Sequence, residues 1–158
     1  MFRELTRKKQ QLSEEECIRL LKTQKRGVLS VVGDGGYPYG MPMNHLYNEE
    51  DGKLYFHCGR TGHRMDAVRA NDRASFCLLD EGTRTPGEWA LNLRSVIVFG
   101  RIEIVEDPAL TVEITTRLSR KFTEDEAYIQ AEIEGNLHRT VLLALTPEHL
   151  CGKLVNES

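Results

Sequence analysis

The sequence contains no apolar run near the ~18 residues that indicate a membrane-spanning helix. Its basic N-terminal residues are not followed by the apolar segment of a secretory signal. Four cysteines are present, but no two of them form a CxxC pair. Their even number would allow two disulfides, yet a chain of this size and composition favours free thiols. We therefore expect a cytoplasmic protein with reduced cysteines, and Cys77 among its core residues.

The chain also lacks the short motifs of common nucleotide and hydrolase sites. It has no GxGxxG, no GxxxxGK[ST] and no GxSxG, which disfavours a Rossmann site, a P-loop and a nucleophile elbow. The net charge of −3 gives no sign of nucleic acid or of an anionic membrane as a partner. A length of 158 residues, 40% apolar and 28% charged, predicts one globular domain over residues 1–158.

Hairpin-linked strands dominate the predicted secondary structure, which favours an antiparallel barrel. Pro42 cannot donate to a ladder and therefore marks an edge, a bulge or a ligand-facing break. The predicted strands are 28–32 (expected to be buried), 39–47, 53–58, 73–79, 89–105 with a bend near Gly100, and 140–145, stopped by Pro147 before a loose tail.

Four helices are predicted between these strands. Ser13 and Glu16 form a capping box for the first helix, which should end near Gly27. The second covers 63–70, and the third begins at Asp107-Pro108, an N-cap acid followed by proline. A second possible capping box, Thr123 with Glu126, predicts a helix that runs to about Gly135.

Residues 39–66 concentrate the features that predict a binding site. Two strands bring polar side chains together, and the second ends in a corner containing Gly59 and Gly62. Glycines let the backbone approach a ligand, and the helix that follows presents its N–H groups to an anion. His63 and Arg64 stand at that helix start, where an arginine can contact a phosphate with two hydrogen bonds. The stretch therefore predicts the phosphate end of a nucleotide-like cofactor site.

Other readings of these residues are weaker or stay open. His57, Cys58 and His63 resemble a zinc set, but neighbouring strand residues point to opposite faces and no second ligand pair follows. His45 is either a substrate-facing residue or a rim histidine. Trp89 is either a core or rim anchor or a ligand-stacking residue.

These motifs resemble those of the pyridoxamine 5′-phosphate oxidase-related, FMN-binding split-barrel family, and within it the nitroimidazole-resistance (Nim-like) branch. The resemblance covers nearly the whole chain, and residues 53–67 carry its most specific part. The matching segments are MFREL (1–5), GVLSVVGDGGYPYGMPMN (27–44), KLYFHCGRTGHRMDA (53–67), SVIVFGR (95–101) and EHLCGK (148–153).

The resemblance implies a mainly β fold with flanking helices, a six-stranded antiparallel split β-barrel. It implies a homodimer with FMN at the interface and a small-molecule electron acceptor. Pro42, Met43 and Asn44 would run along the flavin ring, and His57, Cys58 and Gly59 would hold the ring and ribityl chain. Gly62, His63 and Arg64 would form the phosphate end, and Arg94, Ser95 and Val96 would approach from the partner subunit.

The expected function is that of a flavin-dependent oxidoreductase of the nitroreductase type. In flavin chemistry the cofactor carries the electron transfer, and the protein supplies orientation and electrostatics. No residue is assigned as a catalytic acid or base, and no metal is expected. The basic cluster that binds the substrate phosphate in the oxidase is not recognisable here, which argues against vitamin B6 oxidation. The alternatives are a non-enzymatic flavin- or haem-binding module, with His57, His138 or His149 as axial ligand, and a structural dimer with a vestigial site.

Overall fold

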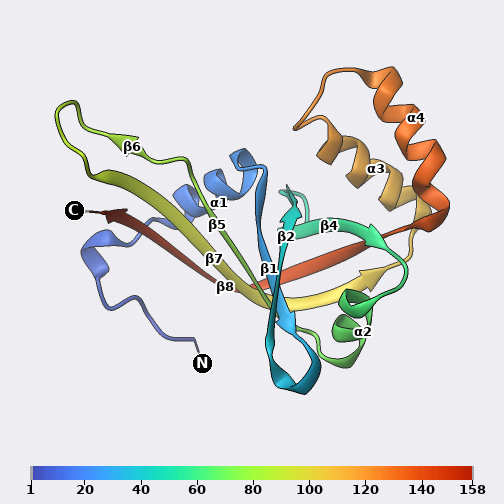
Figure 1. Ribbon diagram of the computed structural model, residues 1–158, viewed down its shortest axis with the longest axis horizontal. Coiled ribbons are helices and arrows are strands. Elements are labelled where there is room, and N and C mark those ends of the chain that lie inside the picture. The colour runs from blue at the N-terminus through green and yellow to red at the C-terminus, as the bar shows by residue number, and fades with distance from the viewer. Residues whose placement is uncertain (1, 158) are drawn as a thin grey trace.

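The computed structural model describes residues 2–157 (Figure 1), so Met1 and Ser158 lie outside the described part. One antiparallel sheet organises the fold, with helices at its periphery. The strands are β1 Arg26–Val32, β2 Pro38–Asn44, β3 Leu46–Asn48, β4 Lys53–Gly59, β5 Arg73–Leu79, β6 Thr83–Arg84, β7 Leu91–Val105 and β8 Thr140–Asn156. The α-helices are α1 Glu14–Thr23, α2 His63–Ala70, α3 Pro108–Ser119 and α4 Glu126–Asn136, and short 3-10 turns cover Lys8–Gln10, Asp34–Gly36 and Leu137–Arg139.

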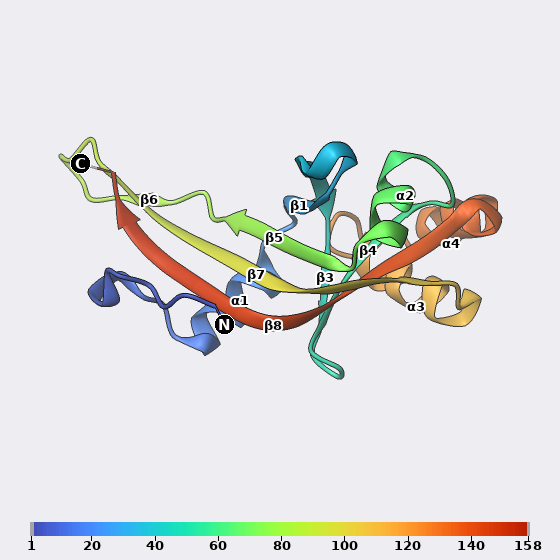
Figure 2. The ribbon, with the colours of Figure 1, turned by 90° about the horizontal axis from the view of Figure 1, so that it is seen from below.

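The strand order shows that the sheet curls back on itself. The order is β2-β1-β5-β7-β8-β4-β3, with β6 paired to β7, so β2 and β3 stand at opposite edges. Yet only His45 separates them in the chain. A sheet whose two edges are joined by one residue must bend into a half-barrel, and the long β7 and β8 sweep along it in Figure 2. The predicted antiparallel split barrel is confirmed. The sheet has eight strands rather than six, because the predicted strand 39–47 breaks at His45 and the loop after β5 adds β6.

The largest error of the sequence prediction concerns the C-terminal strand. β8 does not stop at Pro147 but continues to Asn156, and it pairs with β7 along most of its length. The register shifts between Phe99 and Gly100, where Gly100 faces Pro147. A bulge at this point tolerates a residue without an N–H, and a Cβ at Gly100 would collide with the carbonyl of Thr146. The predicted bend near Gly100 is thus confirmed, and it explains why Pro147 does not end the strand.

Local capping signals are mostly confirmed. Ser13 caps α1 and forms the complete capping box with Glu16, although the helix ends at Thr23 rather than near Gly27. Asp107 caps α3, with Pro108 in the first turn. The cap of α4 is Asp125, which accepts the N–H of Tyr128 at 3.0 Å, and not the predicted Thr123. Thr123 does not cap the helix, because its hydroxyl instead accepts the N–H of Asp125.

The core lies inside the curl of the sheet. Its largest fully buried side chains include Phe56, Phe76, Leu21 and Leu29. A smaller cluster, including Ile114, Leu118 and Leu142, packs α3 against the sheet. None of the helices formed by residues 2–157 has the length and apolar character needed to cross a bilayer.

Two expectations about burial are wrong. The strand 28–32 is buried on one face only, because Val28 and Val32 point outward while Leu29 and Val31 point into the core. Cys77 is likewise on the outer face and only partly buried, although all four cysteines are free, as predicted. Trp89 is 74% exposed in the loop before β7, which excludes a core anchor and leaves the rim and ligand-stacking roles as predictions.

Candidate functional site

The predicted corner between β4 and α2 is present. β4 ends at Gly59, and Gly62 serves as the N-cap residue of α2 with φ of 106°. A side chain at this backbone conformation would be strained, so the chain requires glycine at this point. The helix then begins at His63, as predicted, and the N–H groups of its first turn are directed to the corner.

Arg64 is a half-buried cation whose charge no acid neutralises. Its side chain donates from Nε to the thioether Sδ of Met41 at 3.1 Å, and it also lies beside the thiol of Cys58, whose pKa is raised by burial and lowered by the charge of Arg64. A thioether is a weak acceptor, and within residues 2–157 no carboxylate forms an ion pair with Arg64. Most of the guanidinium therefore remains available, and its geometry suits a phosphate.

His63 is engaged differently from its neighbour. Its ring stacks on Tyr39 of β2 with centroids 4.3 Å apart, and its Nε2 lies 3.6 Å from Asp34. Asp34 belongs to the β1–β2 hairpin, so this contact ties the hairpin to the start of α2. A carboxylate at this distance also competes with an anionic ligand for His63. Arg64 is consequently the better placed of the two predicted phosphate residues.

A small pocket of about 290 Å³ lies beside β2. It is lined by Arg26, Pro42, Met43, Asn44 and His57. Four of these are predicted cofactor residues, so the structure brings the edge of β2 and the side chain from β4 together. Pro42 lies on an edge strand, because β2 has only β1 as a neighbour. This confirms the prediction that Pro42 marks the edge of the sheet.

Not every predicted contact can be made by a side chain. Met43 and Cys58 point into the core, and the Cys58 thiol lies 3.6 Å from Met65 Sδ. Both residues can offer only backbone groups to a ligand. His57 is on the open face. The surrounding protein, and then the charge of Arg64, lower the pKa of His57, so its ring is neutral at pH 7.

A larger cleft of about 900 Å³ opens on the other side of His57. One wall is the end of β4 with the corner, including Gly59, Arg60 and Arg64, and the other wall is α3, α4 and the 3-10 turn that follows. The second wall supplies Leu118, Phe122, Tyr128, Ile129, Ile133 and Arg139, together with His138 and several hydroxyl side chains. Sequence reasoning missed this wall. The apolar pair Ile129 and Ile133, four residues apart on a short helix with few other apolar residues, was the available signal.

The residues predicted to act from a partner subunit lie elsewhere. Ser95 pairs with Leu79 at the end of β5. Arg94 contacts Asp80, and Val96 is fully buried. None of these three residues lines the small pocket beside β2 or the cleft at the corner.

The remaining histidines do not converge on one point. His45 is fully buried, with Nε2 donating to the carbonyl of Leu21 at 2.7 Å, so it is neither a substrate-facing nor a rim residue. His138 lines the large cleft, while His149 stacks on Phe2 with centroids 5.1 Å apart. Across residues 2–157, no group of three or more His, Cys, Asp or Glu side chains is arranged to hold a metal ion.

Comparison with solved structures defines the class of the fold. A candidate 5-nitroimidazole antibiotic resistance protein from Bacteroides thetaiotaomicron superposes with a TM-score of 0.77 at 16% identity, covering 92% of this chain and 87% of that one. An FAD-binding protein from Mesorhizobium loti superposes with a TM-score of 0.68 at 24% identity, covering 91% of this chain and 94% of that one. An FAD and haem binding protein from Mycobacterium smegmatis superposes with a TM-score of 0.72 at 22% identity, covering 94% of this chain and 74% of that one. At these identities the likeness shows a shared split-barrel fold.

The family follows from the sequence itself. The family model described as pyridoxamine 5′-phosphate oxidase matches residues 13–154, from the cap of α1 almost to the end of β8. The chain belongs to this family, as its motifs predicted. Comparison with curated proteins gives no match.

Proposed function

We propose that the protein binds FMN and acts as a flavin-dependent oxidoreductase on a small-molecule acceptor. The observation that carries this proposal is Arg64, a half-buried guanidinium without an acid partner at the start of α2. Burying a charge without a counter-ion is costly. A site that keeps such a charge beside a cavity is suited to an anionic ligand, and a flavin mononucleotide ends in a phosphate.

The two cavities fit the rest of the cofactor. Arg64 would hold the phosphate, with the N–H groups of the first turn of α2 beside it. The edge of β2 at Pro42 and Asn44 would lie along the ring, and the neutral His57 between the two cavities would orient it. The flavin supplies the electron transfer, and the chain supplies position and electrostatics. This division of labour agrees with the absence of an assigned acid or base.

A homodimer would complete this site. On the outer face of the sheet, cross-strand pairing aligns Pro42, Val28, Cys77, Ile97 and Cys151 in one row. The row is partly exposed and apolar, with Val28 at 41%, and it begins at the small pocket beside β2. A second copy seated on this face would cover apolar surface next to the cofactor. Arg94 and Ser95 would then come from the partner subunit.

The first test is whether the purified protein carries flavin. It should show the absorption bands of oxidised flavin and bleach with dithionite. Arg64→Ala should weaken FMN binding ten- to a hundredfold, because a charge-assisted hydrogen bond contributes about 1.5–3 kcal/mol. Riboflavin, which has no phosphate, should bind the two proteins equally.

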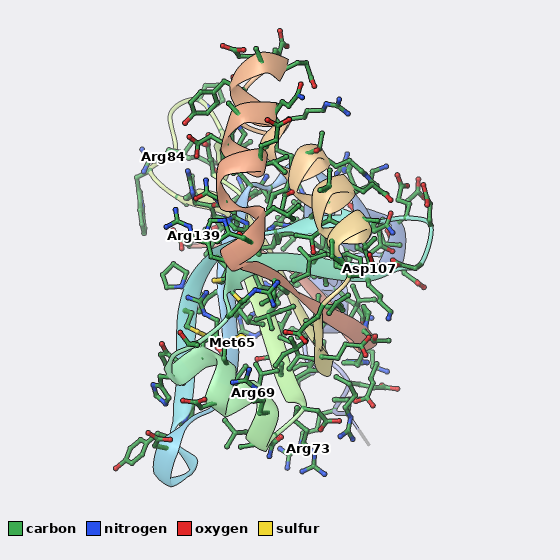
Figure 3. The ribbon with its side chains drawn as sticks, turned by 90° about the vertical axis from the view of Figure 1, so that its right-hand side faces the viewer. Met65, Arg69, Arg73, Arg84, Asp107 and Arg139 are labelled. Atoms are coloured by element: carbon green, nitrogen blue, oxygen red, sulfur yellow. The ribbon has the colours of Figure 1, made fainter. Side chains whose placement is uncertain are left out.

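Arg69→Ala is the matched control. Arg69 lies in the last turn of the same helix (Figure 3). It is exposed and pairs with Asp66, so its removal should leave the FMN affinity unchanged. A colourless protein whose melting temperature does not respond to excess FMN would refute the proposal, because a ligand that binds only the folded state must raise it.

The acceptor class follows from the branch that the sequence resembles. We propose nitroaromatic compounds as substrates, and steady-state reduction of a nitroimidazole by the flavin-loaded protein tests this directly. A protein that binds FMN but reduces neither nitroaromatics nor quinones would instead be a flavin-binding module.

Haem binding is the second candidate, supported by one feature of the cleft. His57 and His138 both line it, whereas His149 does not. A neutral imidazole beside a cavity of this size can serve as an axial ligand. Haem addition should then give a Soret band that is lost in His57→Ala or His138→Ala. A spectrum unchanged by both substitutions excludes this candidate.

A further inference from the structure

The large cleft has a chemistry that FMN alone does not use. Among the side chains that line it, Arg60, Arg64 and Arg139 are cations with His138 beside them, and Glu132 is the only acid. Arg60 is neutralised by Glu106 at 3.2 Å. Arg139 hydrogen-bonds only to the amide of Asn136 and, like Arg64, has no acid partner within residues 2–157. Two unneutralised guanidinium groups therefore line one cavity. Figure 3 shows Arg139 at the base of α4.

The far wall of the cleft is apolar and incompletely filled. α4 buries only Ile129 fully, while Ile133 is half-buried and Tyr128 is exposed. With Phe122, which is 38% exposed, these side chains form a slot between the helix pair and the corner. Planar rings are well suited to such a slot, because aromatic and branched side chains gain area and stacking against their faces. Thr115 and Thr123 add hydroxyl oxygens, which already hydrogen-bond to Thr111 and Asp125 and keep one further lone pair or proton for a sugar hydroxyl.

We propose that this cleft is an adenylate site, which binds the phosphate and the base of an adenine nucleotide next to the flavin phosphate. The inference rests on the proposed flavin function, because Arg64 is shared by the phosphate end of that site and by the cleft. Arg139 binds the second phosphate, and the slot at Phe122 and Ile133 receives the base. The adenylate has two possible sources. It is either the second half of FAD or the ADP half of a nicotinamide nucleotide that reduces the flavin.

The experiment titrates the protein stripped of cofactor with FMN, FAD and ADP, and then the FMN-loaded protein with ADP. If the source is FAD, it should bind at least tenfold more tightly than FMN. If the source is a nicotinamide nucleotide, FAD and FMN should bind alike, and ADP should bind the FMN-loaded protein and compete with the reducing nucleotide. Either result supports the adenylate site.

Two variants and a control locate the site. Arg139→Ala should weaken FAD or ADP binding about tenfold and leave FMN unchanged, because only the second phosphate contact is lost. Ile133→Trp should fill the slot and have the same selective effect. Arg117→Ala, on α3 but outside the cleft and paired with Glu113, should change neither.

The outcomes separate this inference from the proposed function. Equal binding of FMN and FAD, with no ADP binding at 1 mM, roughly the weakest affinity of interest, would overturn the adenylate site while the flavin function stands. Absence of FMN and FAD binding would refute the flavin function. Binding of ADP to the flavin-free protein, sensitive to Arg139→Ala, would still support the site.

Discussion

α1 and α4 are helices of ten and eleven residues, yet they are anchored to the sheet very differently. α1 places Cys17, Leu20 and Leu21 in the core, whereas α4 buries only Ile129. Between α4 and the corner lies the 900 Å³ cleft, and α1 adjoins the dense cluster around Phe76. Since buried apolar area stabilises the folded state, α1 belongs to the part of the molecule that carries stability. α4 belongs to the part that can exchange solvent for a ligand.

The sharpest test of this contrast uses the same substitution on both sides. Phe76 is fully buried, and Phe76→Ala should reduce the free energy of unfolding by about 3–5 kcal/mol. Phe122, at the cleft, is 38% exposed, so Phe122→Ala should reduce the free energy of unfolding far less. The ring of Phe122 also interacts with the cations of Lys25 and Arg26, 5.4 and 5.3 Å from its centroid, and each such interaction contributes about 0.5–1 kcal/mol. Urea denaturation of both variants measures the difference, and equal losses would show that the cleft side is part of the stability core.

The second test concerns acid stability and depends on His45. Its Nε2 donates to the carbonyl of Leu21, and its Nδ1 is buried with no hydrogen-bond partner among residues 2–157. Burial, and then the charge of Lys121, lower the pKa of His45 to about 4. The unfolded chain therefore takes up a proton near pH 6.5 that the folded protein refuses until about pH 4. Stability should fall as the pH falls through this interval, by about 3 kcal/mol from this residue.

His45→Gln isolates that contribution, because an amide can keep the hydrogen bond to Leu21 and does not titrate in this range. The loss of stability between pH 6.5 and 4 should be smaller in the variant. Lys121 does not confound the result, because burial lowers its pKa to about 8 and its own effect appears above that pH. If both proteins lose stability equally, the core around His45 does not limit the acid stability of the fold.

The sequence correctly predicted the structural features that depend on residues close together in the chain. The capping box at Ser13, the Asp107-Pro108 helix start and the corner from Gly59 to Gly62 each depend on residues a few positions apart. Pro147 was misread because its missing N–H is accommodated by a bulge opposite Gly100, 47 positions earlier in the chain. His45 was misread because its burial depends on contacts with α1, at the carbonyl of Leu21, and with Phe76 of β5.

The residues of the candidate site were likewise predicted only where the local sequence determines their position. Arg64 and His57 were found from the corner and strand in which they lie. Arg139 and Ile133 were not, because they reach the cleft only through the arrangement of α4 against β4. The partner-subunit residues remain a prediction that one chain does not test. Long-range pairing and assembly, rather than local propensity, account for what the sequence concealed.

The smallest expected effect compares the caps of the two helices. Ser13→Ala removes the capping box of α1 and should lower the free energy of unfolding by about 1 kcal/mol. Asp125→Ala removes the cap of α4, but fraying of a helix held by one buried residue need not unfold the sheet. Its effect on global stability should therefore be smaller. Hydrogen exchange should instead show faster amide exchange confined to α4. Loss of a full 1 kcal/mol from Asp125→Ala would mean that α4 unfolds together with the core, and the contrast between the two helices would be wrong.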